Sequence, residues 1–155
     1  MYVKKDLIDG KFYQLEVQDT AGQEQFVLLR EDYVLYSHGF LIVYSVAGKN
    51  AKKSLENVET YFNDIRMVHG ESIPIMITAS KIDLPRDISN KECHDMVNKL
   101  RKSHKNIEHI ETSAKTPTNV STAFQRLCQL VLREQGESGT SAHSEDDTCK
   151  CCTIL

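Results

Sequence analysis

Residues 40–46, Phe-Leu-Ile-Val-Tyr-Ser-Val, and residues 73–79, Ile-Pro-Ile-Met-Ile-Thr-Ala, decide the fold. Both are short and nearly continuous apolar runs, which is the pattern of strands buried on both faces of a parallel sheet. Residues 107–112 are a weaker candidate for the same role. Helical periodicity fills the intervals between these runs, so strands alternate with helices along the chain. That alternation predicts an α/β layered fold.

A hairpin is predicted ahead of this alternating region. Residues 2–8 and 12–17 have the composition of strands, and Asp9-Gly10 stands between them. That dipeptide favours the positive φ angles of a tight hairpin turn. In the second strand apolar and polar side chains alternate, so one face is expected to be buried.

Three helices are predicted from apolar residues spaced three and four apart, over residues 55–65, 93–100 and 120–131. Gly70 follows the first as a stop signal. Ser89-Asn-Lys-Glu92 precedes the second and fits a capping box, in which hydroxyl and carboxylate satisfy free backbone donors.

Composition limits the class of protein. The 155 residues suit one domain, with 40% hydrophobic and 26% charged residues and a net charge of −3. Because no long basic run is present, a dedicated nucleic-acid binder is not expected. From about Gln135 the sequence turns to Gly, Ser, Thr and acids. We therefore expect a domain over residues 1–134 and a flexible tail over residues 135–155.

The five cysteines form two groups. Cys93 and Cys128 lie within predicted helices, where small buried thiols are expected. Cys149, Cys151 and Cys152 lie in the last seven residues, and no secretory segment that would favour disulfides is visible. The tail cysteines need another explanation.

Three loops that follow predicted strands carry candidate chemistry, because ligands bind at such strand ends in open α/β sheets. The first is Asp19-Thr-Ala-Gly-Gln23, the second is Ser80-Lys-Ile-Asp83, and the third is Glu111-Thr-Ser-Ala-Lys115. A carboxylate in the first loop can hold Mg²⁺ through water, and a glutamine can orient an attacking water. A carboxylate in the second can accept two hydrogen bonds from guanine. Each motif alone is an ordinary turn; their order and placement together indicate a guanine-nucleotide site.

The three loops resemble those of Ras-superfamily small GTPases, in the Ras-like branch, and the resemblance extends from Tyr2 to Leu155. It implies a P-loop NTPase-like, mostly parallel sheet with flanking helices, and GTP or GDP with Mg²⁺ as cofactors. It implies that Gln23 positions the hydrolytic water and that Asp19 contacts the metal indirectly, through water. The residues implied in nucleotide binding are Asp19, Ala21, Gly22, Ser80, Lys81, Asp83, Ser113, Ala114 and Lys115. Exchange factors, GTPase-activating proteins and effectors are the implied partners, through the segment from Leu28 to Tyr36.

Two family features are absent from this sequence. None of the seven glycines belongs to a Gly-x-x-x-x-Gly-Lys-[Ser/Thr] loop, and the first-switch threonine is also absent. That loop supplies most contacts to the triphosphate. With base contacts alone we expect millimolar affinity, about −4 kcal/mol. The domain is thus expected to be N-terminally truncated, and this chain alone is expected to be an inactive GTPase.

The truncation is expected to weaken the fold as well. In the family the missing first strand lies mid-sheet, between the strands that end near Val17 and begin at Phe40. Losing about six buried side chains forfeits on the order of 9–18 kcal/mol of gross burial, against a typical net stability of about 5–15 kcal/mol. We expect a gap in the sheet and an unstable or molten isolated chain. Ser80 also departs from the family's usual asparagine, and its shorter hydroxyl offers fewer hydrogen bonds to a nucleotide.

The last residues of the sequence predict a lipidation signal. Cys152-Thr-Ile-Leu155 is a C-a-a-X box, and the final leucine favours a geranylgeranyl group on Cys152. One lipid binds reversibly, and the acidic stretch 144–147 cannot serve as a second, polybasic signal. Cys149 and Cys151 are therefore candidates for palmitoylation. The expected location is the cytoplasmic face of a cellular membrane.

The leading hypothesis is a membrane-anchored GTP-binding switch protein whose N-terminus is missing from this sequence. The alternative is a genuine short product that starts at Met1, cannot cycle GTP, and competes for effectors or regulators as a prenylated binding protein. A product without function is a third possibility. The sequence does not decide between a partial record and a short isoform.

Overall fold

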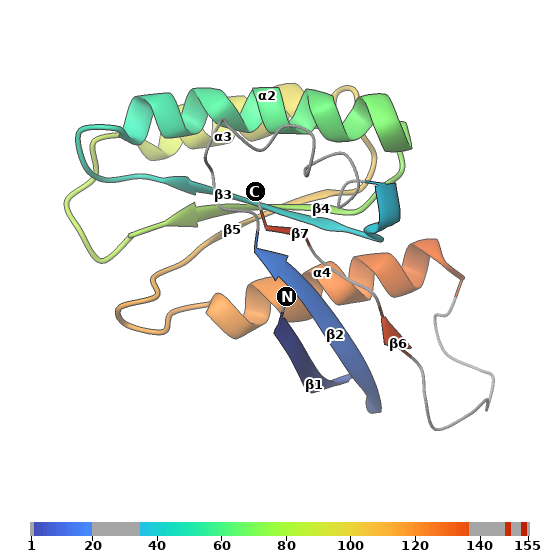
Figure 1. Ribbon diagram of the computed structural model, residues 1–155. Coiled ribbons are helices and arrows are strands. Elements are labelled where there is room, and N and C mark those ends of the chain that lie inside the picture. The colour runs from blue at the N-terminus through green and yellow to red at the C-terminus, as the bar shows by residue number, and fades with distance from the viewer. Residues whose placement is uncertain (1, 20–34, 137–147, 150–152, 155) are drawn as a thin grey trace.

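The protein is described by a computed structural model, which describes residues 2–19, 35–136, 148–149 and 153–154. A single sheet has helices α2 and α3 on one face and α4 on the other (Figure 1). In chain order the elements are β1 (Tyr2–Ile8), β2 (Lys11–Asp19), β3 (Phe40–Ser45), α2 (Ala51–His69), β4 (Ile75–Ser80), α3 (Asn90–Arg101), β5 (Ile107–Glu111), α4 (Val120–Glu134), β6 (Thr148–Cys149) and β7 (Thr153–Ile154). The predicted α/β fold is confirmed.

The predicted hairpin is present. Strands β1 and β2 pair antiparallel from Tyr2 opposite Val17 to Ile8 opposite Lys11. Asp9 and Gly10 form the two-residue turn with φ angles of 50° and 84°. Two positive φ angles give the turn whose twist matches the strands, which is why this dipeptide sets the register.

The rest of the sheet is parallel, with the order β1-β2-β7-β3-β4-β5. Strand β3 pairs with β4, and β4 with β5, along the two apolar runs and the weaker third one. Strand β4 begins at Ile75, because Pro74 has no N–H for the ladder; its carbonyl accepts from the Phe40 N–H at 2.9 Å. Because β2, β7, β3, β4 and β5 all run parallel, their carboxyl ends share one edge of the sheet.

Apolar side chains pack into two clusters, one on each face of the sheet. The first lies between the sheet and helices α2 and α3 and includes Phe40, Phe62 and Ile77. The second lies between the sheet, with β1 and β2, and α4, and includes Leu15, Met76 and Leu127. Successive residues of β4, Met76 and Ile77, enter opposite clusters, as expected of a strand buried on both faces.

The helix ends follow the local signals. At the start of α3, Ser89 Oγ accepts from the Glu92 N–H at 3.2 Å, and Glu92 Oε2 accepts from the Ser89 N–H at 2.8 Å. This is the predicted capping box. Gly70 ends α2 with a φ of 77°, and its N–H donates to the Arg66 carbonyl at 2.9 Å.

Cys93 and Cys128 are buried free thiols, as predicted. None of the helices in the described ranges has the length and apolar character to cross a membrane.

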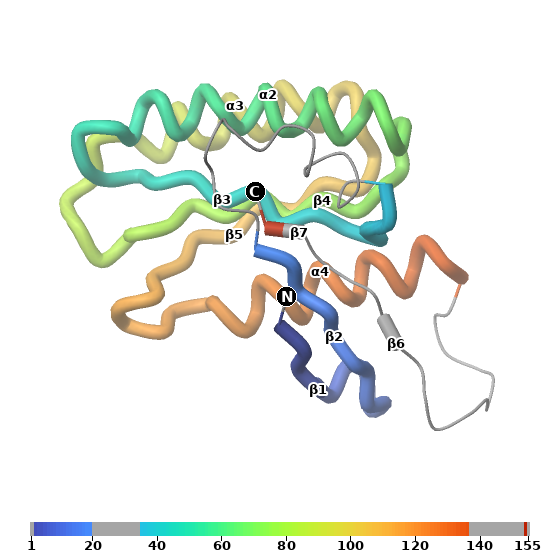
Figure 2. The backbone as a smooth tube through the Cα atoms, viewed as in Figure 1, coloured from blue at the N-terminus to red at the C-terminus, as the bar shows by residue number. Residues whose placement is uncertain are grey.

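Two short segments of the tail pair with the sheet. Strand β6 pairs parallel with β2, with Gln14 opposite Thr148. Strand β7 enters the sheet between β2 and β3, at the position where a gap is expected (Figure 2). Since β7 is only two residues long, it covers two of the six residues of β3. Strand β7 therefore fills only part of the expected gap between β2 and β3.

Candidate functional site

The second and third predicted loops come together at the carboxyl edge of the sheet. Ser113 Oγ donates to Asp83 Oδ1 at 2.6 Å, and the Ile82 N–H donates to the Thr112 carbonyl at 3.3 Å. Ser113 is fully buried, whereas Asp83 is exposed. A buried hydroxyl thus fixes the direction of an exposed carboxylate, leaving its second oxygen available to a ligand.

The Ser113 hydroxyl is itself held in place. Its oxygen accepts from the Thr116 N–H at 3.2 Å, and the Ser113 N–H donates to the Thr118 carbonyl at 3.1 Å. The hydrogen bond from Ser113 lowers the pKa of Asp83 below its ordinary value of 3.8, and a hydrogen bond from its own backbone and the positive charge of Lys115 act in the same direction, whereas desolvation opposes them. Asp83 is therefore ionised at neutral pH and can only accept hydrogen bonds.

Lys81 has an unusual backbone. Its φ angle is 65°, in the left-handed region that costs a non-glycine residue of order 1–3 kcal/mol. The Leu84 N–H donates to the Lys81 carbonyl at 3.1 Å and closes a tight turn. This turn places Lys81 and Asp83 on one exposed loop.

Ser80, which was expected to contact nucleotide, bonds within the sheet. Its Oγ donates to the Tyr44 carbonyl at 2.8 Å, and its own carbonyl accepts from the Val46 N–H at 3.1 Å. The single hydroxyl proton is used by β3, so only the acceptor lone pairs of Ser80 are left for a ligand. This supports the expectation that Ser80 offers less than an asparagine would.

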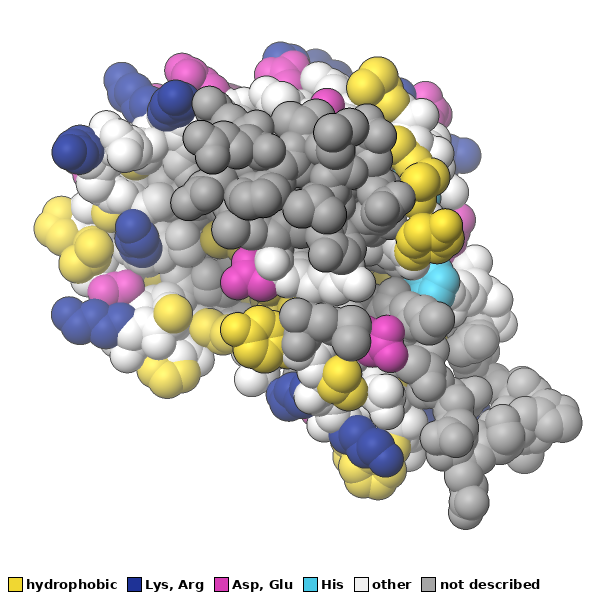
Figure 3. Space-filling view, in the orientation of Figure 1, with side chains coloured by type: hydrophobic (Ala, Val, Ile, Leu, Met, Phe, Trp, Pro, Cys, Tyr) yellow, Lys and Arg dark blue, Asp and Glu magenta, His cyan; other side chains and the backbone are white. Residues whose placement is uncertain are grey.

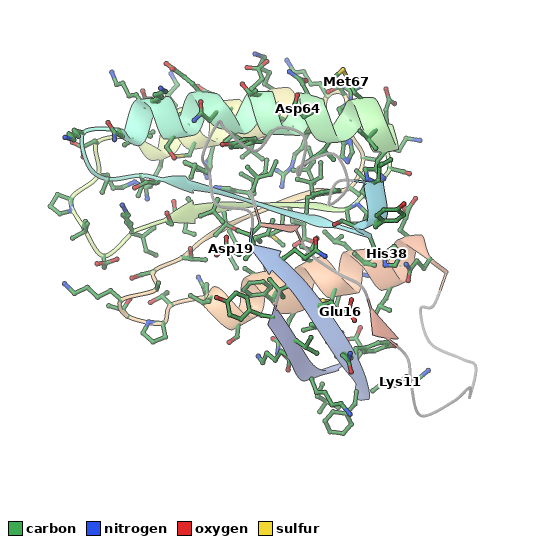
Figure 4. All side chains as sticks on the ribbon, in the orientation of Figure 1. Lys11, Glu16, Asp19, His38, Asp64 and Met67 are labelled. Carbon is green, nitrogen blue, oxygen red and sulfur yellow. The ribbon has the colours of Figure 1, made fainter. Side chains whose placement is uncertain are left out.

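Asp19 ends β2 on the same edge, close to the middle of the sheet (Figure 4). Between β2 and β4 lie β7 and β3, so three strand spacings, about 14 Å, separate Asp19 from the Ser80–Asp83 loop. Only an extended ligand can contact both. A carboxylate suits Mg²⁺, but no group of three or more metal-ligating side chains occurs in the described ranges. Several predicted functional residues lie outside the described residues: Ala21, Gly22, Gln23, Cys151 and Cys152. Most of the segment from Leu28 to Tyr36 also lies outside them.

Two positioning residues were missed by sequence reasoning. Arg86 Nη1 bonds Glu111 Oε1 at 2.8 Å, and Arg86 Nε donates to the Ile88 carbonyl at 3.2 Å. This pair ties the loop after β4 to the end of β5. Asn119 Nδ2 also donates to the Glu111 carbonyl, at 2.9 Å, and thereby holds the start of α4 to the same point. Glu111 belongs to the third loop motif, but Arg86 and Asn119 belong to none of the three motifs, so the sequence had no signal for these two residues.

The whole chain was compared with known proteins. The family model described as Ras family matches residues 1–133. The chain belongs to the Ras family. It is 34% identical over 150 residues to Ras-like protein 1 of Saccharomyces cerevisiae, covering 95% of this chain and 46% of that protein. The chain thus spans about half the length of this relative.

Family membership agrees with the three loop motifs, and the fold class and the resemblance are confirmed. The Asp83–Ser113 contact joins two of these motifs and presents an ionised, directed, exposed carboxylate beside a lysine turn with a positive φ angle. On the face shown in Figure 3, lysine and arginine side chains are scattered among acidic ones, and the described residues form no continuous basic patch there.

Replacing Ser113 by alanine should raise the pKa of Asp83 toward its ordinary value of 3.8, because the leading cause of its lowering is the Ser113 hydrogen bond. NMR titration of the Asp83 carboxyl carbon measures the change. Ser80→Ala is the matched control, since the Ser80 hydroxyl bonds Tyr44 and not Asp83. An Asp83 pKa that stays low in Ser113→Ala would show that the hydroxyl does not hold the carboxylate.

Proposed function

We propose that this chain carries the base-reading part of a membrane-anchored small GTPase, a signalling switch between GTP-bound and GDP-bound states. Asp83 accepts hydrogen bonds from guanine, Lys81 covers the ring with its aliphatic stem, and Ala114 and Lys115 offer backbone amides to the guanine carbonyl. The observation that carries the proposal is the 2.6 Å hydrogen bond that aims Asp83. Ras family membership supports it.

The phosphate end of the site belongs to the first loop. Asp19 would hold Mg²⁺ through water, Gly22 would donate to the terminal phosphate, and Gln23 would orient the hydrolytic water. Mg²⁺, when bound, neutralises charge that develops on the phosphates. These residues do not replace the amides and lysine of a phosphate-binding loop. The 155 residues alone therefore bind GTP in the millimolar range, about −4 kcal/mol, and hydrolysis is a property of the complete protein.

Exchange factors, GTPase-activating proteins and effectors would bind the segment from Leu28 to Tyr36. Within its described end, Leu35 is 54% exposed and Tyr36 is 77% exposed. Large exposed apolar side chains of this kind are common in interaction surfaces. The same exposure supports the second candidate function, a binding protein that competes for these partners without cycling GTP.

Membrane attachment is through lipid on Cys152, with Cys149 and Cys151 as sites for a second lipid. The support is the spacing of Cys152-Thr-Ile-Leu155 at the C-terminus of a Ras family chain. Two lipids would hold the protein stably at a cytoplasmic membrane surface, whereas one would bind reversibly.

Asp83→Asn tests the base-reading role. The carboxylate accepts from two donors of guanine, whereas an amide both accepts and donates, which suits the 2-oxo group of xanthine. We expect Asp83→Asn to weaken GTP binding at least about tenfold and to favour xanthosine triphosphate, because one lost charged hydrogen bond is worth about 1.5–3 kcal/mol. Ligand-observed NMR at millimolar nucleotide measures both affinities.

The control for this exchange is Asp87→Asn in the same loop. Asp87 accepts from the Gly48 N–H at 2.6 Å and does not contact Ser113 in the described structure. Its replacement should leave the preference between the two nucleotides unchanged. Equal preferences in wild type and Asp83→Asn would reject guanine reading by Asp83.

A further inference from the structure

The carboxyl ends of helices α2, α3 and α4 lie at one side of the molecule (Figure 1). Strands β3, β4 and β5 are parallel, so each helix that follows one of them returns the chain to the amino edge of the sheet. Two contacts join these helix ends: the Lys105 N–H donates to the Glu71 carbonyl at 3.3 Å, and Asn106 Nδ2 donates to Glu134 Oε2 at 2.7 Å. We call the exposed surface at these ends the end face, and it comprises Met67, Arg101, Lys102, Lys105 and Arg133.

The end face carries positive charge that is not neutralised locally. Its four basic side chains are exposed, and none of them forms an ion pair within the part of the chain that the structure describes. Two acids at the same helix ends are already bonded, since Glu71 pairs with Arg66 at 3.0 Å and Glu134 accepts from Asn106. Cations are favourable at helix carboxyl ends, so this cluster costs the fold little.

Buried contacts fix the backbone of the end face. His104, between Lys102 and Lys105, is 3% exposed, and its Nε2 bonds the Ile73 carbonyl at 2.7 Å. The two lysines are therefore exposed on either side of an anchored residue. A large apolar side chain accompanies them, because Met67 in the last turn of α2 is 81% exposed. The end face thus combines fixed cations with an exposed apolar side chain.

We propose that the end face binds the anionic headgroups of a membrane and supplies the second membrane signal that the acidic tail lacks. This role rests on the proposed lipid on Cys152. The negative surface of a cytoplasmic leaflet attracts lysine and arginine side chains. An apolar side chain among them can enter the boundary between headgroups and acyl chains, as Met67 is placed to do.

The tail starts beside the end face. Helix α4 ends at Glu134, and from there to Cys152 the chain spans at most about 60 Å. Lipid on Cys152 would therefore keep the end face near the bilayer and raise its effective concentration there. The base-reading loop stays accessible, because β4 is six residues long and places Asp83 about 20 Å away, past the opposite edge of the sheet.

Vesicle binding of a singly lipidated chain tests the role of the charges. Cys149 and Cys151 are replaced by serine, and Cys152 is coupled to an alkyl maleimide, so that no transferase is needed. The remaining thiols, Cys93 and Cys128, are buried, and mass spectrometry verifies a single adduct. Affinity is measured by sedimentation with vesicles of phosphatidylcholine alone and with vesicles that contain about 30% phosphatidylserine.

The test variant combines Arg101→Gln, Lys102→Gln and Lys105→Gln. Each cation near an anionic leaflet strengthens binding about fivefold. The variant should therefore lose at least about tenfold in affinity for the phosphatidylserine vesicles and bind phosphatidylcholine vesicles as before. At about 1 M salt, where the Debye length is about 3 Å, the difference from the unsubstituted chain should disappear.

The control variant combines Lys49→Gln, Lys52→Gln and Lys53→Gln. These three exposed lysines lie around the start of α2, at the other end of that helix from Met67, and their replacement removes the same charge. The control should bind phosphatidylserine vesicles within about threefold of the unsubstituted chain, because these charges are expected to face away from the bilayer. Equal losses in the two variants would overturn the proposal.

A single tryptophan locates the contact, since the chain has none of its own. Met67→Trp places it on the end face, and Leu84→Trp places it at a 43% exposed position beyond the opposite edge of the sheet. Lipids brominated in their acyl chains should quench the emission of Met67→Trp at least about twofold more than that of Leu84→Trp, because only the end face enters the headgroup boundary. Equal quenching would overturn the proposal.

The lipid anchor is tested separately, by incubating the unsubstituted chain with a geranylgeranyl transferase and geranylgeranyl diphosphate. No transfer to Cys152 would reject the anchor and the role of the end face as a second signal. The vesicle and quenching results involve no transferase. They can therefore reject contact between the end face and lipid even where Cys152 is lipidated.

Discussion

Phe62→Ala should lower the free energy of unfolding by about 3–5 kcal/mol, the range for removing a large aromatic side chain from a packed core. Phe62 is 1% exposed within the cluster between the sheet and helices α2 and α3. Its ring meets that of His104 edge-on, with centroids 5.5 Å apart, and the Arg66 guanidinium lies 5.6 Å from its centroid. The substitution leaves a cavity. It also removes the ring that His104 and Arg66 contact. Urea denaturation measures the loss.

Met67→Ala is the control on the same helix. Met67 lies on the outer side of α2 and is 81% exposed, so its truncation should change the free energy of unfolding by less than about 0.5 kcal/mol (Figure 4). A similarly small effect for Phe62→Ala would mean that this cluster is not tightly packed. The comparison therefore distinguishes an ordered core from a collapsed one.

The expected instability of the chain bears on the same measurement. Sequence reasoning assumed that about six buried side chains are lost from mid-sheet, and β7 returns only two residues. Net stability should then lie near the low end of the usual range of about 5–15 kcal/mol, so the loss in Phe62→Ala should move the urea midpoint close to zero denaturant. A sharp two-state melt of the wild type, with strong near-ultraviolet dichroism, would contradict the expected instability.

Local signals predicted most of the fold. The Asp9-Gly10 turn, the apolar run of β3 and the Ser89–Glu92 capping box each depend on neighbouring residues only, and each is confirmed. Strand β7 was not predicted, because Thr153 and Ile154 have no strand pattern of their own. They pair because two strands far away in the sequence, β2 and β3, present free edges at the right spacing. Such pairing depends on the assembled sheet.

In the candidate site, too, the sequence predicted what depends on motifs and not what depends on the assembled structure. The motif order predicted that Asp83 and Ser113 belong to one site, and a 2.6 Å hydrogen bond joins them. It did not predict that the Ser80 hydroxyl donates to the Tyr44 carbonyl, or that Lys81 has a φ of 65°. The first depends on the rotamer chosen beside β3, and the second is imposed on a residue type that ordinarily avoids that region. Neither has a signature in residue type.

Lowering the pH from 7.5 to 5 should destabilise the protein through two histidines, the buried His104 and the half-buried His109. Desolvation is the first cause that lowers the pKa of His104 and of His109 below the ordinary value of 6.5. His104 Nε2 lies 2.7 Å from the Ile73 carbonyl and so carries the donated proton, while no partner is found for its buried Nδ1 among the described groups. A second proton on that ring would be buried without a partner.

The direction of the effect follows from proton uptake. Above about pH 6.5 these side chains are neutral in both the folded and the unfolded chain, so the full stability is present. Below it the unfolded chain binds protons that the folded chain does not, so the free energy of unfolding falls as pH decreases, until the folded pKa is reached. The slope should approach about 1.4 kcal/mol per pH unit for each histidine. Asp6, Asp83 and Glu92 have lowered pKa values and contribute only in a more acidic window.

His104→Gln isolates one of the two contributions. A glutamine amide can donate to the Ile73 carbonyl as His104 does but does not titrate, so the variant should retain stability at pH 7.5 and lose about half of the slope between pH 6.5 and 5. His109→Gln should remove the other half, although Tyr44, whose hydroxyl lies 3.1 Å from His109 Nε2, needs the new side chain as its partner. Burial raises the pKa of Tyr44, so its hydroxyl stays protonated throughout this range. Urea denaturation at half-unit steps of pH gives both slopes, and a slope unchanged by both substitutions would assign the acid sensitivity to other groups.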